Sequence, residues 1–356
     1  MRKTFLEVDK NAFLSNINII KEHCGNKEIM PVVKANAYGT YLNKEMDLMN
    51  KFNMVAVAIV DEAIQLRKNG YKNDIFVLNQ PYEEEIEDII KYNIIVGVSS
   101  FSFLDKINEF NDSVRVHVEV ETGMGRTGVL GSLLDEFILK LKGSNVVVEG
   151  VYTHLSSADI DYEFTNKQIN LFENAVSKLK MYFDSIKYVH CEASNGIVNF
   201  DVDCCNLVRP GLIMYGYPSS KSMIGKLDLK PVLKFRSSIS FIKDIDVGDS
   251  VSYGRSFVAS KKMKVATIGC GYADGVFRKL SNKGFVSVKG KRCKILGNVC
   301  MDSFMIDVSG LDVSVGDAVY LFDNEIVSVE EIADICETIN YEIIASISER
   351  VPRVML

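Results

Sequence analysis

The sequence lacks the patterns that mark nucleic-acid-binding, metal-binding and membrane proteins. Its 41 Lys and Arg stand against 47 Asp and Glu, a net charge of −6, with no basic cluster suited to a phosphate backbone. The eight cysteines form no CxxC pair and the four histidines are not spaced like zinc ligands, so neither a metal site nor a disulfide framework is indicated. No apolar stretch is long enough to span a membrane, and none follows the basic start of the chain. We therefore expect a cytoplasmic protein with reduced thiols and no metal, nucleic-acid or membrane partner.

The sequence also has no long polar tract, and its apolar residues are spread along the whole chain. With 356 residues, of which 47% are hydrophobic, the chain is too long for one ordinary core and long enough for two. The composition therefore predicts a globular protein of two domains.

Helix and strand patterns alternate in the N-terminal part of the sequence. Asp9 is suited to cap a helix whose apolar residues recur at helical spacing from Phe13 to Ile20. Asp61 is expected to cap a second helix, which closes at Gly70. Short runs rich in β-branched residues are expected to form eight strands, over 29–33, 54–60, 74–78, 94–98, 114–120, 146–153, 188–192 and 204–208.

Eight strands, most of them followed by a helical interval, predict a closed (β/α)₈ TIM-like barrel over residues 10–218. The structural rival is an open, doubly wound sheet. It is disfavoured because the GxGxxG fingerprint is absent after the first strand, where the one glycine is Gly39.

The residue pattern of the sequence changes after residue 218. β-Branched runs are broken by glycine turns at Gly248, Gly290 and Gly316, a spacing typical of β domains. We therefore expect residues 219–356, together with an N-terminal strand within 1–9, to form a mostly β domain. Its main exception is a helix over 329–336.

Chemically capable residues fall at the ends of the expected barrel strands, where barrels hold their functional residues. Lys34 ends the first strand, where desolvation would lower its pKa and favour a Schiff base with an aldehyde cofactor. A glycine-rich loop carrying Arg126 follows the fifth strand, and His154, Ser194 and Arg209 end the last three. Each residue alone also fits a structural role. Together they suit a cofactor that carries a phosphate, an aldehyde and a heteroaromatic nitrogen.

Eight segments of this sequence, in their order along the chain, resemble the alanine racemases, a family of pyridoxal-phosphate enzymes with a barrel followed by a β domain. The resemblance covers almost the whole length. The segments are VVKANAYG (32–39), VETGMGRTGV (120–129), THLSSAD (153–159), VRPGLIMYG (208–216), VSYGR (251–255), IGCGYADG (268–275), GNVCMDSFMIDV (297–308) and ISERVPR (347–353).

The resemblance implies roles for individual residues. Lys34 is similar to the residue that forms the Schiff base with pyridoxal 5'-phosphate and acts as one catalytic base, and Tyr253 to the tyrosine that acts as the opposing base. The residues similar to the other cofactor-binding and substrate-binding positions are Tyr38, Ser194, Gly211, Leu212 and Tyr341 at the phosphate, Arg209 at the pyridine nitrogen, Arg126 near the cofactor phenolate and the substrate, His154 between Arg209 and Tyr253, and Met301 and Asp302 beside the substrate.

The family supplies Tyr253, Met301 and Asp302 from the partner subunit, so the resemblance implies a homodimer with shared active sites. The always-charged Arg209 would keep the pyridine nitrogen unprotonated and limit side reactions such as transamination.

The sequence departs from the family pattern at three places. Glu119 stands where many relatives have a lysine, often carbamylated, and we expect it to offer Arg126 the same negative charge. Ala193 replaces a common asparagine, and Thr40-Tyr41 replaces the usual His-Gly, which alters the start of the first helix after the strand.

The resemblance implies racemisation of alanine, in which two bases work on opposite faces of Cα. A broad-specificity or serine racemase, or a basic-amino-acid decarboxylase, is an alternative on the same scaffold; Tyr341 favours a small substrate because a bulky phenol leaves little room. A pyridoxal-phosphate-binding homeostasis protein is a non-catalytic alternative, against which the whole C-terminal domain argues.

Overall fold

The computed structural model describes residues 3–356, which divide into two compact units. Within these residues no helix is long and apolar enough to cross a membrane. The boundary between the units falls at Lys230, later than the residue 218 expected from the sequence. We name them the barrel unit, formed by residues 14–37 and 41–230, and the β unit, formed by the chain up to Phe13, residues 38–40 and residues 231–356.

The strands of the barrel unit are parallel and close into a ring. The main sheet runs in the order β3-β4-β5-β6-β8-β9, and β10 pairs with β2. Single bridges from Val32 to Ala56 and from Ala193 to Arg209 join these two sheets at both edges, which confirms the predicted (β/α)₈ barrel. The barrel strands are β2 (Glu28–Ile29), β3 (Met54–Val57), β4 (Asp74–Val77), β5 (Ile95–Val98), β6 (Val114–Glu121), β8 (Val146–Tyr152), β9 (Tyr188–His190) and β10 (Leu207–Val208), and the short β7 (Val129–Leu130) pairs with β6.

The strand patterns reflect burial. Strands β3 and β5 are buried along their whole length, as expected of parallel strands covered on both faces. The first strand is assigned shorter than expected, although Met30 N and Val32 N still donate to the carbonyls of Val208 and Pro210 at 2.9 Å; the ladder ends because Pro210 has no N–H to donate back.

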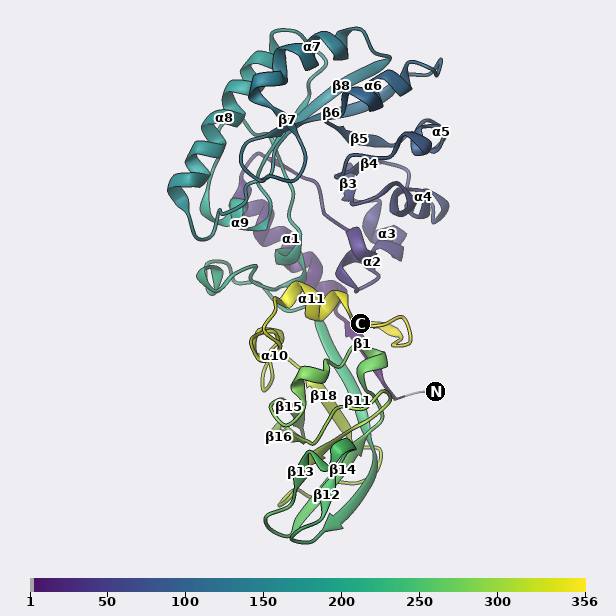
Figure 1. The fold of residues 1–356 in the computed structure, drawn as a ribbon, viewed down its shortest axis with the longest axis vertical. Helices are drawn as coiled ribbons and strands as arrows, with labels where there is room; N and C mark the ends of the chain where they lie inside the picture. The colour runs from purple at the N-terminus through teal and green to yellow at the C-terminus, as the bar shows by residue number, and fades with distance from the viewer. Residues whose placement is uncertain (1–2) are drawn as a thin grey trace. The chain divides into compact units, whose positions relative to one another are not determined.

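Helices lie outside the barrel strands, as α7 and α8 do beside β6 and β8 (Figure 1). Asp9 caps the first helix as predicted, since its Oδ1 accepts the N–H of Asn11 and of Ala12 at 2.9 Å. Asp61 was wrongly predicted as a cap: it lies in the first turn of its helix, and extended Ile59 holds the cap position. The helices are α1 (Lys10–Cys24), α2 (Lys34–Tyr38), α3 (Met46–Met49), α4 (Val60–Lys68), α5 (Ile86–Lys91), α6 (Phe101–Ile107), α7 (Leu134–Lys142), α8 (Tyr162–Lys180) and α9 (Ser194–Asn199).

Polar side chains fill part of the barrel interior. Arg115 forms ion pairs with Asp74 at 2.7 Å and with Glu149 at 2.8 Å. The register between β6 and β8 then shifts by one residue, so that His117 faces Gly150. The shift lets β8 direct first Glu149 and later Tyr152 into the barrel, although strict alternation would not.

The β unit is built on the long antiparallel strand β11. Strands β11, β14, β17, β16, β15 and β18 pair in a closed ring, and β1 and β19 extend the sheet beside β11. The glycine turns fall as predicted, since Gly248, Gly290 and Gly316 all have positive φ. The strands are β1 (Phe5–Val8), β11 (Leu233–Ile245), β12 (Ser250–Val251), β13 (Phe257–Val258), β14 (Met263–Ile268), β15 (Phe285–Val288), β16 (Lys291–Leu296), β17 (Phe304–Asp307), β18 (Ala318–Phe322) and β19 (Arg353–Met355).

Two helices interrupt the β unit. Helix α10 (Val329–Cys336) has the predicted bounds and is capped by the Ser328 hydroxyl, which accepts the N–H of Glu331. Helix α11 (Asn340–Ala345) was not anticipated, because six residues are too few to establish a helical period.

Candidate active site

Lys34 begins a left-handed turn at the end of the first barrel strand. The four residues after it, Ala35 to Tyr38, all have φ between 51° and 56°. This conformation costs roughly 1–2 kcal/mol for each residue with a Cβ, and such strain typically occurs at functional sites. Hydrogen bonds compensate for it, from Ala37 N to Val33 O at 2.9 Å and from Tyr41 N to Asn36 O at 2.8 Å.

Glu62, from the first turn of α4, fastens this turn to the neighbouring strand. Its carboxylate accepts the N–H of Ala35 at 2.6 Å and that of Ala58, just after β3, at 2.8 Å. Burial and the positive charge of Arg126 and Arg209 lower the pKa of Lys34, and the negative charge of Glu62 partly offsets them. The amine is therefore more readily neutral than an exposed lysine.

Arg209 is buried at the end of β10, and its hydrogen-bond partners are neutral. One nitrogen, Nη1, donates to His190 Nδ1 at 2.6 Å and to the His190 carbonyl at 2.9 Å. The other, Nη2, donates to the carbonyls of Thr153 at 2.8 Å and Cys191 at 3.2 Å, and lies 3.4 Å from His154 Nδ1. The guanidinium is thus oriented by groups that do not neutralise it.

His154 is a neutral neighbour of Arg209. Burial, together with the charges of Arg209, Arg126 and Lys34, lowers its pKa to about 3. Gln168 of α8 holds this strand end, donating to the His154 carbonyl at 3.1 Å and accepting the Ser156 N–H at 2.9 Å. The position of the imidazole is therefore set by α8 as well as by β8.

Ser194, Gly211 and Leu212 meet at one place in the barrel unit. The Gly211 N–H donates to Ser194 Oγ at 3.1 Å, at the starts of α9 and of the 3₁₀ helix Leu212–Tyr215. The first N–H groups of a helix have no acceptor within it and are suited to an anion.

Tyr38 and Tyr341, also predicted at the phosphate, lie in the β unit. Their rings are 6.0 Å apart, and burial, with the neighbouring Tyr341, raises the pKa of the Tyr38 phenol. Gly39 follows with φ of 79°, and a Cβ there would lie 2.6 Å from the Ile344 carbonyl oxygen. The Arg353 side chain donates to the Gly39 carbonyl at 2.8 Å, which fixes this segment beside α11.

Glu119 and Arg126 do not form a direct ion pair within 4.0 Å in the described residues. Glu119 is only 3% exposed, and its Oε2 accepts the Tyr152 hydroxyl at 3.1 Å. Burial raises the pKa of this carboxyl, while Thr127, Tyr152 and the charge of Arg126 oppose the shift. Arg126 lies in an exposed loop, so the two charges interact at longer range than the expectation implied.

Tyr253, Met301 and Asp302 lie in the β unit on a well-fixed backbone. Ser252 Oγ donates to the Asn298 carbonyl at 2.6 Å, and Asn298 Nδ2 donates to the Tyr253 carbonyl at 2.8 Å. The side chains point outward: Tyr253 is 72% and Met301 52% exposed. Asp302 accepts a hydrogen bond from Arg350 at 2.8 Å.

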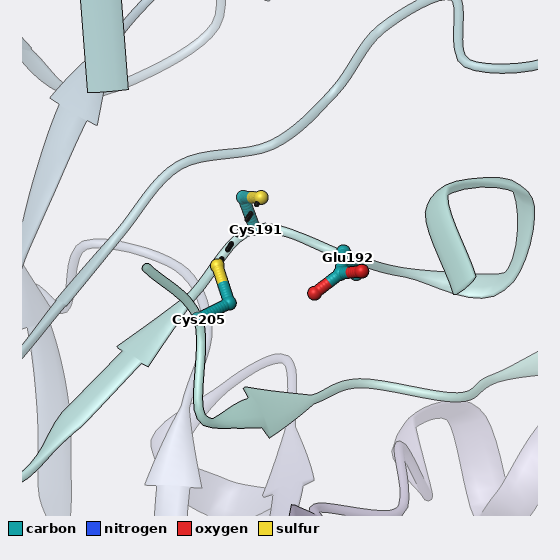
Figure 2. A group of neighbouring side chains, drawn as sticks. All are labelled: Cys191, Glu192 and Cys205. Carbon is teal, nitrogen blue, oxygen red and sulfur yellow. Dashed lines mark hydrogen bonds between the residues drawn. The ribbon is translucent and has the colours of Figure 1, made fainter. Parts of the chain in front are cut away.

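One group of side chains in the described part of the chain has metal-ligating atoms close together, Cys191, Glu192 and Cys205 (Figure 2). The two sulfur atoms are 3.5 Å apart, and Lys27 donates to both carboxylate oxygens of Glu192, at 2.9 and 3.0 Å. An ammonium group already holds the carboxylate, and the hydrogen bond to Cys191, together with burial, raises the pKa of Cys205; we therefore assign this group a packing role behind β9.

The sequence reasoning missed several residues that hold the site together. Glu62 follows a strand end, but an acidic residue in the first turn of a helix is common and does not by itself indicate a role in a site. Gln168 lies in the middle of α8, where no local sequence pattern indicates a role. His190 lies in the seventh predicted strand and was given no role, because only the fold brings it beside Arg209.

Comparisons with known proteins indicate the family of the chain. A family model described as the N-terminal domain of alanine racemase matches residues 8–219, and one described as the C-terminal domain matches residues 232–355. The alanine racemase of Halothermothrix orenii is 38% identical over 365 residues, covering 99% of this chain and 96% of the relative. That of Clostridium tetani is 38% identical over 374 residues, covering 100% and 96%.

Solved structures lead to the same family. An alanine racemase of Clostridium difficile superposes with a TM-score of 0.93 at 34% identity, covering 100% of this chain and 96% of that one. An alanine racemase of Bacillus anthracis with bound L-Ala-P superposes with a TM-score of 0.93 at 35% identity, covering 100% and 95%. The chain therefore belongs to the alanine racemase family.

Proposed function

We propose that this protein is a pyridoxal-phosphate-dependent alanine racemase, which interconverts L-alanine and D-alanine. The observation that carries the proposal is Lys34, an amine whose pKa is lowered by burial and by two arginines at the end of the first barrel strand. The full-length similarity to proteins named alanine racemase supports it.

The residues present fit pyridoxal 5'-phosphate. A neutral lysine amine is suited to bond with an aldehyde, the buried cation of Arg209 to face a ring nitrogen, and the Ser194 and Gly211 region to receive a phosphate. Tyr38, Leu212 and Tyr341 complete the proposed phosphate site. The group, when bound, supplies the electron sink that makes the Cα proton of an amino acid acidic.

The chain itself supplies the proton transfers. Lys34 Nζ removes or returns the Cα proton on one face, and Tyr253 Oη does so on the other. His154, neutral because its pKa is about 3, links Arg209 to Tyr253 without adding charge. Arg126, Met301 and Asp302 bind and orient the substrate.

Tyr253, Met301 and Asp302 come from the partner subunit in this proposal, so the active protein is a homodimer with two shared sites. Their outward-facing side chains on a fixed backbone support it. We also place the enzyme in the cytoplasm, in agreement with the absence of disulfides among its eight described cysteines.

Glu119 takes the role of the carbamylated lysine of many relatives, providing negative charge near Arg126. Its burial supports this assignment over that of a water-facing carboxylate. Because no direct ion pair joins the two, the charge of Glu119 acts on Arg126 through space.

The decisive experiment is to purify the protein, record its visible spectrum and follow D-alanine formation from L-alanine, with serine, lysine and ornithine tested side by side. A yellow protein that racemises alanine fastest is the expected result. Faster turnover of another substrate would replace the proposed specificity, and a yellow protein inert towards every amino acid would refute the enzymatic function.

A further inference from the structure

Two histidines continue the hydrogen-bond network of Arg209 into the barrel core. Behind Arg209, His190 Nε2 lies 2.9 Å from Nδ1 of His117, and both side chains are fully buried. The ring of Phe76 stacks on His117 at 4.5 Å, and that of Tyr152 stacks on His190 at 5.2 Å. The aromatic rings hold both imidazoles in fixed planes.

The protons of this network have one consistent arrangement. A guanidinium only donates, so His190 Nδ1 must be the acceptor of the 2.6 Å bond from Arg209. The His190 proton is then on Nε2 and is donated to Nδ1 of His117. His117 consequently carries its proton on Nε2, an atom buried without a hydrogen-bond partner in the described residues.

The backbone is adapted to His117. The register shift between β6 and β8 places His117 opposite Gly150, and a Cβ at Gly150 would lie 2.6 Å from the His117 ring. Register shifts of this kind redirect side chains near active sites. The register shift and the absence of a side chain at Gly150 thus both make room for the His117 ring, although its Nε2 gains no hydrogen-bond partner in the described residues.

We infer that His117 is a positioning residue for the reaction: by accepting the Nε2 proton of His190, it holds this imidazole in the orientation in which its bare Nδ1 accepts from Arg209. Neutral imidazoles orient the guanidinium and leave its full charge directed at the barrel mouth, whereas a carboxylate would neutralise it. The catalytic consequence rests on the proposed function; the proton arrangement does not.

The first test needs no turnover. Holoenzyme labelled with ¹⁵N at its four histidines is examined by NMR, and single variants assign the signals. We expect His190 and His117 each to have a bare Nδ1 and a protonated Nε2. A Nδ1–H tautomer or an imidazolium at either residue overturns the inference.

The second test compares His117→Leu, which removes the acceptor, with His117→Asn, whose side-chain oxygen can take the place of Nδ1. We expect the Leu variant to shift the His190 Nε2 signal, because that N–H loses its acceptor, and to lose about tenfold in kcat with little change in KM, as when an orienting partner is removed. The Asn variant should restore both. Equal losses of kcat in two folded variants, with the His190 Nε2 signal the same in both as in the wild type, would reduce His117 to packing.

Thermal unfolding verifies that each variant folds, and the wild-type spectrum decides the tautomers even where the Leu variant fails. A protein that shows the expected tautomers without racemising alanine refutes the proposed function alone. A racemase with the other tautomers refutes this inference alone.

Discussion

Replacing Glu62 by glutamine separates its two contributions to the site, holding the left-handed turn and supporting the charge on Lys34. The carboxylate accepts two backbone N–H groups, at 2.6 and 2.8 Å, and an amide offers one oxygen. One N–H therefore loses its acceptor, which costs about 1–3 kcal/mol in the free energy of unfolding. The pKa of Lys34 should also fall further, because Glu62 is the neighbour that raises it.

The matched control is Asp61→Asn, which removes the same charge from the same first turn. Asp61 is exposed, so this variant loses only a helix-dipole interaction, about 0.3–1 kcal/mol. Denaturant unfolding of the cofactor-free protein measures stability, and the rate of Lys34 labelling by an amine reagent against pH, read by peptide mapping, measures its pKa. We expect Glu62→Gln alone to lower stability and to move the labelling profile to lower pH. If the two variants match in both assays, Glu62 holds neither the turn nor the charge.

Four further predictions follow from the site. Borohydride should fix the cofactor covalently at Lys34, and peptide mapping that finds the label on another lysine would contradict its role. Glu119→Gln should lower kcat/KM well beyond a surface substitution, since it removes a buried charge; wild-type activity would contradict this. Tyr253→Phe should abolish racemisation yet leave exchange of the D-alanine Cα proton with solvent. Mixing this variant with inactive Lys34→Ala should restore roughly a quarter of wild-type activity, because half of the randomly paired dimers carry one intact site of two. A mixture that exchanges subunits and stays inactive would refute the shared site. The pKa of His154 is about 3 in the folded state and near 6.5 in the unfolded state. As the pH falls below 6.5, the free energy of unfolding should decrease by about 1.4 kcal/mol per pH unit, because only the unfolded state takes up the proton. The free energy of unfolding of His154→Gln should decrease by correspondingly less from about pH 7 to about pH 5.

Much of the barrel was predictable because burial on both faces gives its strands continuous apolar runs. Strand ends were harder to place: the apolar pattern of the first strand continues to Val33, but its ladder ends earlier because Pro210 on the partner strand has no N–H to donate. The start of α4 was misplaced because acidic residues are common both at the cap and in the first turn of a helix. Asp61 and Glu62 both lie in the first turn, and the Glu62 carboxylate accepts the N–H of Ala58.

The site residues that lie at strand ends could be predicted from the sequence. Lys34, His154 and Arg209 stand out by residue type, and the structure brings His154 within 3.4 Å of Arg209. The left-handed turn has no sequence signal, since Ala-Asn-Ala-Tyr contains no glycine. Gln168 could not be predicted, because its partners, in the segments of Thr122 and of His154 to Ser156, are brought to α8 only by the fold.

The pairing of β1 has a consequence for synthesis on the ribosome. Val8 pairs with Leu233 and Met355, so the first strand emerges about 225 residues before its first partner, a wait of roughly 10–45 s at typical elongation rates. The strand is only four residues long and carries Glu7, features that limit pairing with other chains while its edge is open. Every strand of the barrel ring has been synthesised by then. The barrel ring can therefore form during translation, whereas the sheet of the β unit is completed only after β19 has left the ribosome.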